Sequence, residues 1–246
     1  MDKIQQVNQY ILNNQDKVNT KYRPDYHVTA PIGWLNDPNG FSMYKGEYHL
    51  FYQYYPYDSE WGPMHWGHVK SRDLVQWEHM PVALAPDRPY DCDGCFSGSA
   101  IEKEDNLYLF YTGNIKGCKE NEGSDIQIQN MAVSEDGIVF KKVKKNPIVG
   151  VPCLPEHAVP AHFRDPKIIK EDGMYYMIVA SLHISGRGQI LLYESNNLYD
   201  WDYKGVLVRS EKGKGEVWEC PDLFKLQGKD VLIASPQFFP RDGDRY

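Results

Sequence analysis

The pattern of hydrophobic positions changes character near residue 20. The first apolar side chains fall on one face of a helix, at Ile4, Val7, Ile11 and Val18. This spacing predicts an amphipathic helix over Asp2–Val18, in a leader segment of residues 1–20. Beyond residue 26 the helical period disappears, and short runs of aromatic and β-branched residues alternate with Gly, Pro, Asn and Asp. We therefore expect a short N-terminal helix followed by an all-β domain over residues 21–246.

A turn motif recurs along the β region. It joins a Ser and an Asp or Asn to an aromatic residue six positions after the Ser, and it occupies residues 71–77, 134–140 and 195–201. The polar side chains of such a motif can bond the backbone of their own turn while the ring packs beneath it. We therefore expect these copies to organise hairpins and not to take part in catalysis.

A second pattern lies upstream of each turn motif. Four strand-like runs follow charged or Gly-containing turns, at Tyr48–Tyr54, Leu107–Tyr111, Met174–Ala180 and Val231–Ala234. Each hairpin is preceded by a polar motif, at Asn36–Gly40, Phe96–Ser99, Arg164–Pro166 and Glu219–Asp222. A period of about 60 residues in an all-β sequence predicts a propeller of four-stranded blades. Equivalent positions of successive blades converge at one end of the central channel, so we expect the four polar motifs to share one pocket.

The same period predicts that the fourth unit is incomplete. Its turn motif would be due near residue 255, whereas the sequence has 246 residues. A closed four-bladed ring is the alternative, but the absent fourth turn motif disfavours it. We expect a propeller truncated within blade four, whose open strand edges favour self-association.

Composition excludes several classes of partner. The net charge is −7 and no basic cluster stands out, so nucleic acid is not expected as a partner. Apolar runs are too short to span a bilayer, and the residues after Met1 do not form a secretion signal, so we expect no membrane partner and a cytoplasmic location. Five cysteines fit reduced thiols better than a disulfide framework. Cys92 and Cys95 lack a second ligand pair, so no metal site is expected.

Three of the polar motifs contain a candidate catalytic carboxylate each: Asp37, Asp165 and Glu219. Like charges brought together in one channel raise at least one pKa. A glycosidase uses this effect, because one carboxyl group acts as the general acid while another stays ionised as the nucleophile. A high aromatic content, with 18 Tyr and 6 Trp, also suits a sugar site. These residues alone indicate a carbohydrate-active propeller.

Four motifs of the sequence resemble, in order and spacing, those of glycoside hydrolase family 32, which comprises invertases, sucrose-6-phosphate hydrolases and fructan hydrolases. They are WLNDPNG at 34–40, FSG at 96–98, RDP at 164–166 and WECP at 218–221. The resemblance implies a five-bladed propeller followed by a β-sandwich domain, of which the sandwich and the end of the propeller are absent here. It implies a retaining hydrolase that releases fructose from β-D-fructofuranosides such as sucrose or sucrose 6-phosphate, without a cofactor.

The resemblance also implies roles for individual residues. Asp37 would be the nucleophile, Glu219 the acid/base and Asp165 the stabiliser of the transition state. The substrate subsite would comprise Trp34, Leu35, Asn36, Gln53, Trp61, Phe96, Ser97, Arg164 and Cys220, with Cys220 modulating the environment of the acid. From charge alone we expect Arg164 to keep Asp165 ionised. Two other functions stay open: an inverting five-bladed glycosidase acting on arabinose polymers, and an inactive or sugar-binding remnant.

Overall fold

The structure is a computed structural model that describes residues 2–239 and 243. One α-helix, α1 (Lys3–Asn14), precedes a chain built almost entirely of antiparallel strands. Three 3₁₀ turns accompany them, at Gln15–Lys17, Lys119–Asn121 and Val151–Cys153. The all-β domain with a short N-terminal helix is therefore confirmed. No helix in the described part of the chain is long and apolar enough to cross a bilayer.

Helix α1 is shorter than the sequence predicts. The carboxylate of Asp2 caps its first turn by accepting the backbone N–H of Gln5. Val7 and Ile11 are buried against the first sheet, as the apolar spacing predicts. The helix ends at Asn14, whose side-chain amide donates to the carbonyl of Tyr10 and competes with the backbone for that acceptor. A 3₁₀ turn over Gln15–Lys17 continues the segment, so the helix predicted to Val18 changes type after Asn14 and ends one residue earlier.

The strands form three four-stranded meanders and one two-stranded sheet. The first sheet contains β1 (Trp34–Tyr44), β2 (Glu47–Tyr55), β3 (His65–Ser71) and β4 (Glu78–His79). The second contains β5 (Cys95–Lys103), β6 (Asn106–Ile115), β7 (Ile126–Ser134) and β8 (Lys141–Lys142). The third contains β9 (Ala158–Glu171), β10 (Met174–His183), β11 (Arg187–Ser195) and β12 (Asp202–Arg209), and the last contains β13 (Trp218–Leu226) and β14 (Lys229–Pro236). All four predicted strand runs lie in the second strand of a sheet.

Each sheet opens with a tight hairpin between its first two strands. The two loop residues have positive φ in all four hairpins, at Lys45–Gly46, Glu104–Asp105, Asp172–Gly173 and Gln227–Gly228. Two successive left-handed residues make the turn whose twist matches that of the flanking strands. Local chemistry therefore sets the same register at the start of every sheet.

The repeated turn motif acts as the sequence predicts. Ser71 Oγ accepts the backbone N–H of Leu74, and Asp73 Oδ1 accepts those of the next two residues. The second copy repeats these bonds with Ser134 and Asp136, and the third uses Ser195 with an Asn in place of the Asp. These bonds confirm a structural role for all three turns.

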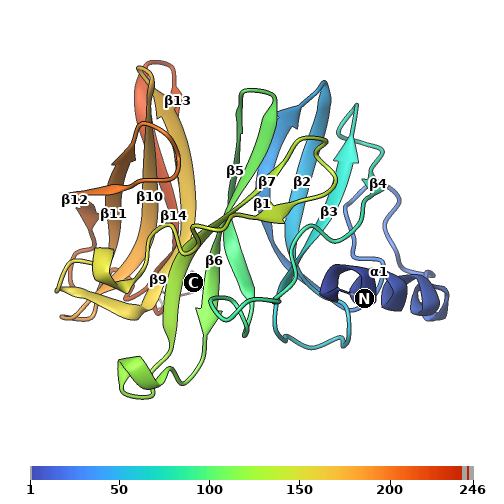
Figure 1. The fold of residues 1–246 in the computed structure, drawn as a ribbon, viewed down its shortest axis with the longest axis horizontal. Coiled ribbons are helices and arrows are strands. Elements are labelled where there is room, and N and C mark those ends of the chain that lie inside the picture. The colour runs from blue at the N-terminus through green and yellow to red at the C-terminus, as the bar shows by residue number, and fades with distance from the viewer. Residues whose placement is uncertain (1, 240–242, 244–246) are drawn as a thin grey trace.

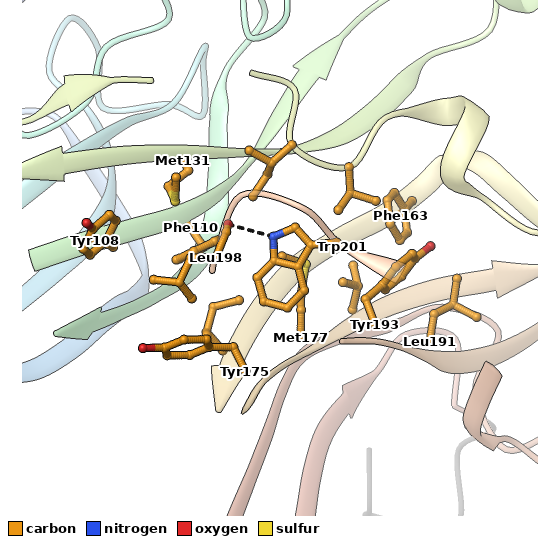
Figure 2. Packing of buried hydrophobic residues seen from close by; sticks show 14 of the residues in the cluster. Tyr108, Phe110, Met131, Phe163, Tyr175, Met177, Leu191, Tyr193, Leu198 and Trp201 are labelled. Carbon is orange, nitrogen blue, oxygen red and sulfur yellow. Dashed lines mark hydrogen bonds between the residues drawn. The ribbon is translucent and has the colours of Figure 1, made fainter. Parts of the chain in front are cut away.

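The aromatic residues of the second and third turns pack between sheets, whereas Trp77 of the first turn packs against the cluster beneath α1. Figure 2 shows Trp201 among the buried side chains that join the second and third sheets. Its ring meets Phe110 edge-on, with centroids 6.0 Å apart, and its indole N–H donates to the carbonyl of Leu198. Phe140 packs in the same way into the cluster between the first and second sheets. The motif thus fixes the spacing between neighbouring sheets.

The sheets follow one another across the molecule as the blades of a β-propeller do. Figure 1 shows them in chain order, from the blue first sheet beside α1 to the orange and red strands. The first strands lie side by side, with β1 against β5, β5 against β9 and β9 against β13. Because each polar motif lies in one of these strands, residues far apart in the sequence meet at the centre.

Candidate active site

The innermost strand of every sheet is irregular at its polar motif. Register shifts occur between Leu35 and Pro38 in β1, Phe96 and Gly98 in β5, Arg164 and Lys167 in β9, and Glu219 and Asp222 in β13. A bulge of this kind redirects side chains out of the regular pleat. Proline is tolerated there because the ladder is already broken, which explains its recurrence in three of the four motifs.

Two residues of these bulges adopt a left-handed conformation that is unusual for a side chain larger than glycine. Asp165 has φ of 63° and Cys220 has φ of 46°. Such a conformation costs of the order of 1–3 kcal/mol and persists only where the surrounding structure imposes it. The strain turns both residues toward the centre of the molecule, where Cys220 N–H donates to Asp165 Oδ2 at 2.9 Å.

The bulges surround a cavity of about 260 Å³. Nine of the twelve residues expected from the sequence line it: Asn36, Asp37, Gln53, Trp61, Phe96, Ser97, Arg164, Asp165 and Glu219. All three expected carboxylates are therefore in one cavity, although they come from three different sheets. Convergence of the polar motifs, inferred from the repeat, is confirmed.

Asp37 is held through one of its two carboxylate oxygens. Ser97 Oγ donates to Asp37 Oδ2 at 2.9 Å. Cys220 Sγ lies 3.7 Å from the same oxygen, within reach of a weak S–H bond. Burial, together with the negative charges of the neighbouring carboxylates, raises the pKa of the Cys220 thiol, so the thiol keeps its proton and can donate it. Both contacts orient the carboxylate without adding a charge.

Asp165 is the most deeply buried of the three carboxylates, with 5% of its surface exposed. Burial is the main cause that raises its pKa from 3.8 to about 6, and the charges of Glu219 and Asp37 act in the same direction. The Cys220 N–H and the Arg164 guanidinium oppose the change but do not overcome it. Arg164 thus favours the ionised form of Asp165, as expected, but desolvation is the larger effect and the net change in this pKa is upward.

Arg164 instead lies beside Glu219. Its Nε is 3.4 Å from Glu219 Oε1, an ion-pair distance, although the alignment is not that of a hydrogen bond. Its Nη1 donates to Gln127 Oε1 at 3.1 Å, which fixes the guanidinium against β7. The side chain of Glu219 is 32% exposed and that of Arg164 is 11% exposed. Glu219 thus lies at the open side of the cavity, within reach of solvent.

Aromatic rings form one wall of the cavity. Trp61 and Phe96 meet edge-on with ring centroids 5.9 Å apart, and Trp61 is 46% exposed. Gln53, in β2, is buried, and its side-chain amide donates a hydrogen bond to the carbonyl of Cys95. A flat, exposed ring beside polar and charged groups suits the mixed apolar and hydroxyl surface of a sugar.

Three expected residues do not line the cavity. The indole N–H of Trp34 donates to Asn36 Oδ1, and Leu35 packs against the cluster beneath α1, so these two support the subsite from outside. Cys220 lines a second cavity of about 280 Å³, which continues past Ser97 and Asp165 along the centre of the sheets. Its backbone and thiol still reach Asp165 and Asp37, so it belongs to the site through these contacts.

The sequence reasoning missed several supporting residues. Gln237 lines the cavity, Gln127 holds Arg164, and the hydroxyl of Thr112 accepts the backbone N–H of Asp165 at 2.9 Å. None of them lies in one of the polar motifs. Thr112 and Gln127 are predictable only as strand residues, and their contacts arise from the packing of one sheet on the next.

Cys92 and Cys95 do not line the cavity. Cys92 is exposed and Cys95 is buried, and neither is in a disulfide. Within residues 2–239 and 243, no cluster of three His, Cys, Asp or Glu side chains is placed to hold a metal ion.

A blade-like arrangement of sheets with a sugar-sized cavity and three converging carboxylates defines a glycoside hydrolase scaffold. Comparison with known families identifies which one. The chain belongs to glycosyl hydrolases family 32, because the model of that family's N-terminal domain matches residues 27–246. The family resemblance of the four motifs is therefore confirmed.

Individual relatives agree with this assignment. A sucrose-6-phosphate hydrolase of Zymomonas mobilis is 44% identical and a raffinose invertase of Escherichia coli is 43% identical, over 92% and 93% of this chain. The solved structure of a Bombyx mori GH32 beta-fructofuranosidase mutant in complex with sucrose is 44% identical, with a TM-score of 0.90 over 98% of this chain. The chain spans about half the length of these relatives, 45%, 46% and 50% respectively.

Proposed function

We propose that this chain carries the catalytic site of a retaining hydrolase for β-D-fructofuranosides such as sucrose or sucrose 6-phosphate. One observation carries the proposal: Asp37, Asp165 and Glu219 line a single cavity beside an exposed tryptophan. The similarity to a sucrose-6-phosphate hydrolase and a raffinose invertase supports the same substrate class.

In the first step, Asp37 acts as the nucleophile. Its Oδ2 is engaged by Ser97 and Cys220, so Oδ1 is the oxygen that attacks the anomeric carbon of the fructosyl unit. The bond from this carbon to the glycosidic oxygen breaks as Glu219 transfers its proton to the departing oxygen. The products of this step are the free leaving group, an ionised Glu219 and a fructosyl ester of Asp37.

In the second step, Glu219 acts as the general base. It takes a proton from a water molecule, whose oxygen attacks the anomeric carbon and displaces Asp37. Glu219 is suited to both steps because it lies at the open side of the cavity, where the leaving group departs and water enters. Fructose is released with its anomeric configuration retained, and both carboxyl groups return to their starting states.

Asp165 stabilises the transition state without bonding to the anomeric carbon. Its ionised carboxylate accepts hydroxyl hydrogens of the fructosyl ring, and these bonds strengthen as positive charge develops on the sugar. Burial makes such bonds stronger than they would be in water. The cost is the raised pKa of this group, so the proposal predicts that activity declines as the pH falls through about 6.

We also propose that the sheets described here are part of a five-bladed propeller whose fourth blade is completed by additional strands. The last sheet has two strands where each of the others has four. Its apolar side chains Phe224, Leu226 and Ile233 are exposed, as are Phe41 and Met43 on the first strand of the first sheet. Further strands packed on these two surfaces would bury both. Without them, the surfaces would favour self-association of the chain.

The test is fructose release from sucrose and from sucrose 6-phosphate, with the anomeric form of the first product followed by proton NMR. We expect release with retained configuration, and loss of turnover in Glu219→Gln. Glu216→Gln is the matched control, because Glu216 is exposed in the same segment and lines no part of the cavity. A product of inverted configuration would favour the alternative of an inverting glycosidase. Sugar binding without turnover would identify an inactive remnant.

A further inference from the structure

Two loops meet at the mouth of the cavity. One, residues 56–64, joins β2 to β3 and carries Trp61; the other, residues 116–125, joins β6 to β7 and begins with Lys116. The ammonium group of Lys116 lies 5.1 Å from the centre of the Trp61 ring. Since Trp61 lines the cavity and is half exposed, this contact places a cation on the rim of the substrate site.

The backbone of Lys116 is held firmly, whereas its side chain is exposed. Lys116 follows β6 directly, and its N–H donates to Asp93 Oδ2 at 2.9 Å. The next N–H, of Gly117, donates to Asp125 Oδ1 at 3.0 Å. None of the ion pairs found among the described residues involves the ammonium group of Lys116.

The rest of the cavity is poorly suited to an anionic group on the substrate. Its wall contains three carboxylates and one guanidinium, and that guanidinium is occupied by Gln127 and Glu219. A phosphate dianion at the rim would be repelled unless another cation offset this field. Lys116 lies at the rim and has an exposed ammonium group, so it can provide that cation.

The loop of Lys116 is also attached to the wall from which the leaving group departs. It leads directly into β7 (Ile126–Ser134), whose second residue, Gln127, holds Arg164 beside Glu219. Gln127 therefore links Glu219, through Arg164, to the end of the Lys116 loop. A group carried by the leaving sugar would meet this loop as it extends out of the cavity past Glu219.

The geometry points to Lys116 as the residue that recognises a phosphate group on the leaving sugar, which makes a phosphorylated disaccharide the preferred substrate. This inference rests on the proposed function, because it assumes that a fructoside enters the cavity with its leaving group toward Glu219. The ammonium group forms a charge-assisted hydrogen bond to phosphate, and such bonds are stronger than neutral ones.

The experiment compares kcat/KM for sucrose 6-phosphate and sucrose in the full chain and three variants. In Lys116→Gln we expect the ratio of the two values to fall about tenfold, the effect of losing one charge-assisted bond. Lys116→Arg keeps the charge and should restore most of the ratio. Lys119→Gln is the matched control, since Lys119 is an exposed lysine of the same loop without a contact to Trp61. Added salt should narrow the wild-type preference by screening.

An unchanged ratio in Lys116→Gln, or an equal loss for both substrates, would overturn the inference, because Lys116 would then only support Trp61. Absence of turnover in the wild type would instead refute the proposed function. In that case calorimetric titration with sucrose 6-phosphate decides the inference separately. A Kd about tenfold weaker in Lys116→Gln than in the wild type supports it, whereas an equal Kd or no binding refutes it.

Discussion

Replacing Asp165 by Asn should stabilise the protein at neutral pH while removing the proposed hydrolase activity. Asp165 is 5% exposed, and its pKa is raised from 3.8 to about 6, chiefly by burial. The ionised side chain is therefore less favourable in the folded protein than in the unfolded chain. An asparagine keeps the size of the side chain and an oxygen that can accept the Cys220 N–H. It carries no charge to desolvate.

The pKa gives the magnitude of this effect. An increase of about two pH units, at about 1.4 kcal/mol per pH unit, corresponds to about 3 kcal/mol of unfolding free energy at pH 7. The folded protein binds the proton of Asp165 below about pH 6, whereas the unfolded chain binds it only below about pH 4. Between these values the cost of the charge disappears as the pH falls. The advantage of Asp165→Asn should therefore be full above pH 6 and absent below pH 4.

The assay is urea denaturation followed by tryptophan fluorescence at several pH values between 4 and 7.5. Taking the difference from wild type at each pH removes the contributions of other buried titrating groups, such as His68, whose pKa burial lowers. Asp73→Asn is the matched control: Asp73 is exposed, and Asn197 accepts the equivalent backbone bonds in the third turn motif, so little change is expected. A variant less stable than wild type at pH 7, or a difference independent of pH, would refute the reasoning.

Two further predictions concern the packing between sheets. Lys142→Met should lower the free energy of unfolding by about 3–5 kcal/mol, because it leaves the fully buried Asp91 without the ammonium group that neutralises it; urea denaturation at pH 7 measures this, and a loss below about 1 kcal/mol would contradict it. Trp201→Ala should cost about 3–5 kcal/mol by opening a cavity between the second and third sheets. Thermal unfolding by circular dichroism checks this second change, and an unaltered Tm would show that the ring does not hold the sheets together.

The sequence was informative about the elements and about the period that arranges them. The hairpins follow from two residues that accept a left-handed backbone, and the turn motifs follow from polar side chains that bond their own turns. These effects act over a few residues, so they can be recognised without knowing the fold. The 60-residue period then indicated that Asp37, Asp165 and Glu219 converge, which the cavity confirms.

The boundary of α1 shows where such local reasoning is insufficient. Apolar spacing indicated a helix to Val18. It cannot predict that the Asn14 side chain competes with the backbone for the Tyr10 carbonyl, where the α-helix ends. Gln127, Thr112 and Gln237 were missed for a different reason. Their roles depend on which residues of a neighbouring sheet they face, and no local pattern records that.

The sequence by itself therefore determined the all-β type of fold, the family and which three carboxylates line the cavity, because each is encoded in short motifs and their spacing. Only the tertiary structure decided how these groups behave. Burial outweighs Arg164 at Asp165, and the guanidinium pairs with Glu219 instead. Both results depend on how much water and charge surround a group after folding, and these quantities are set by contacts between residues far apart in the chain.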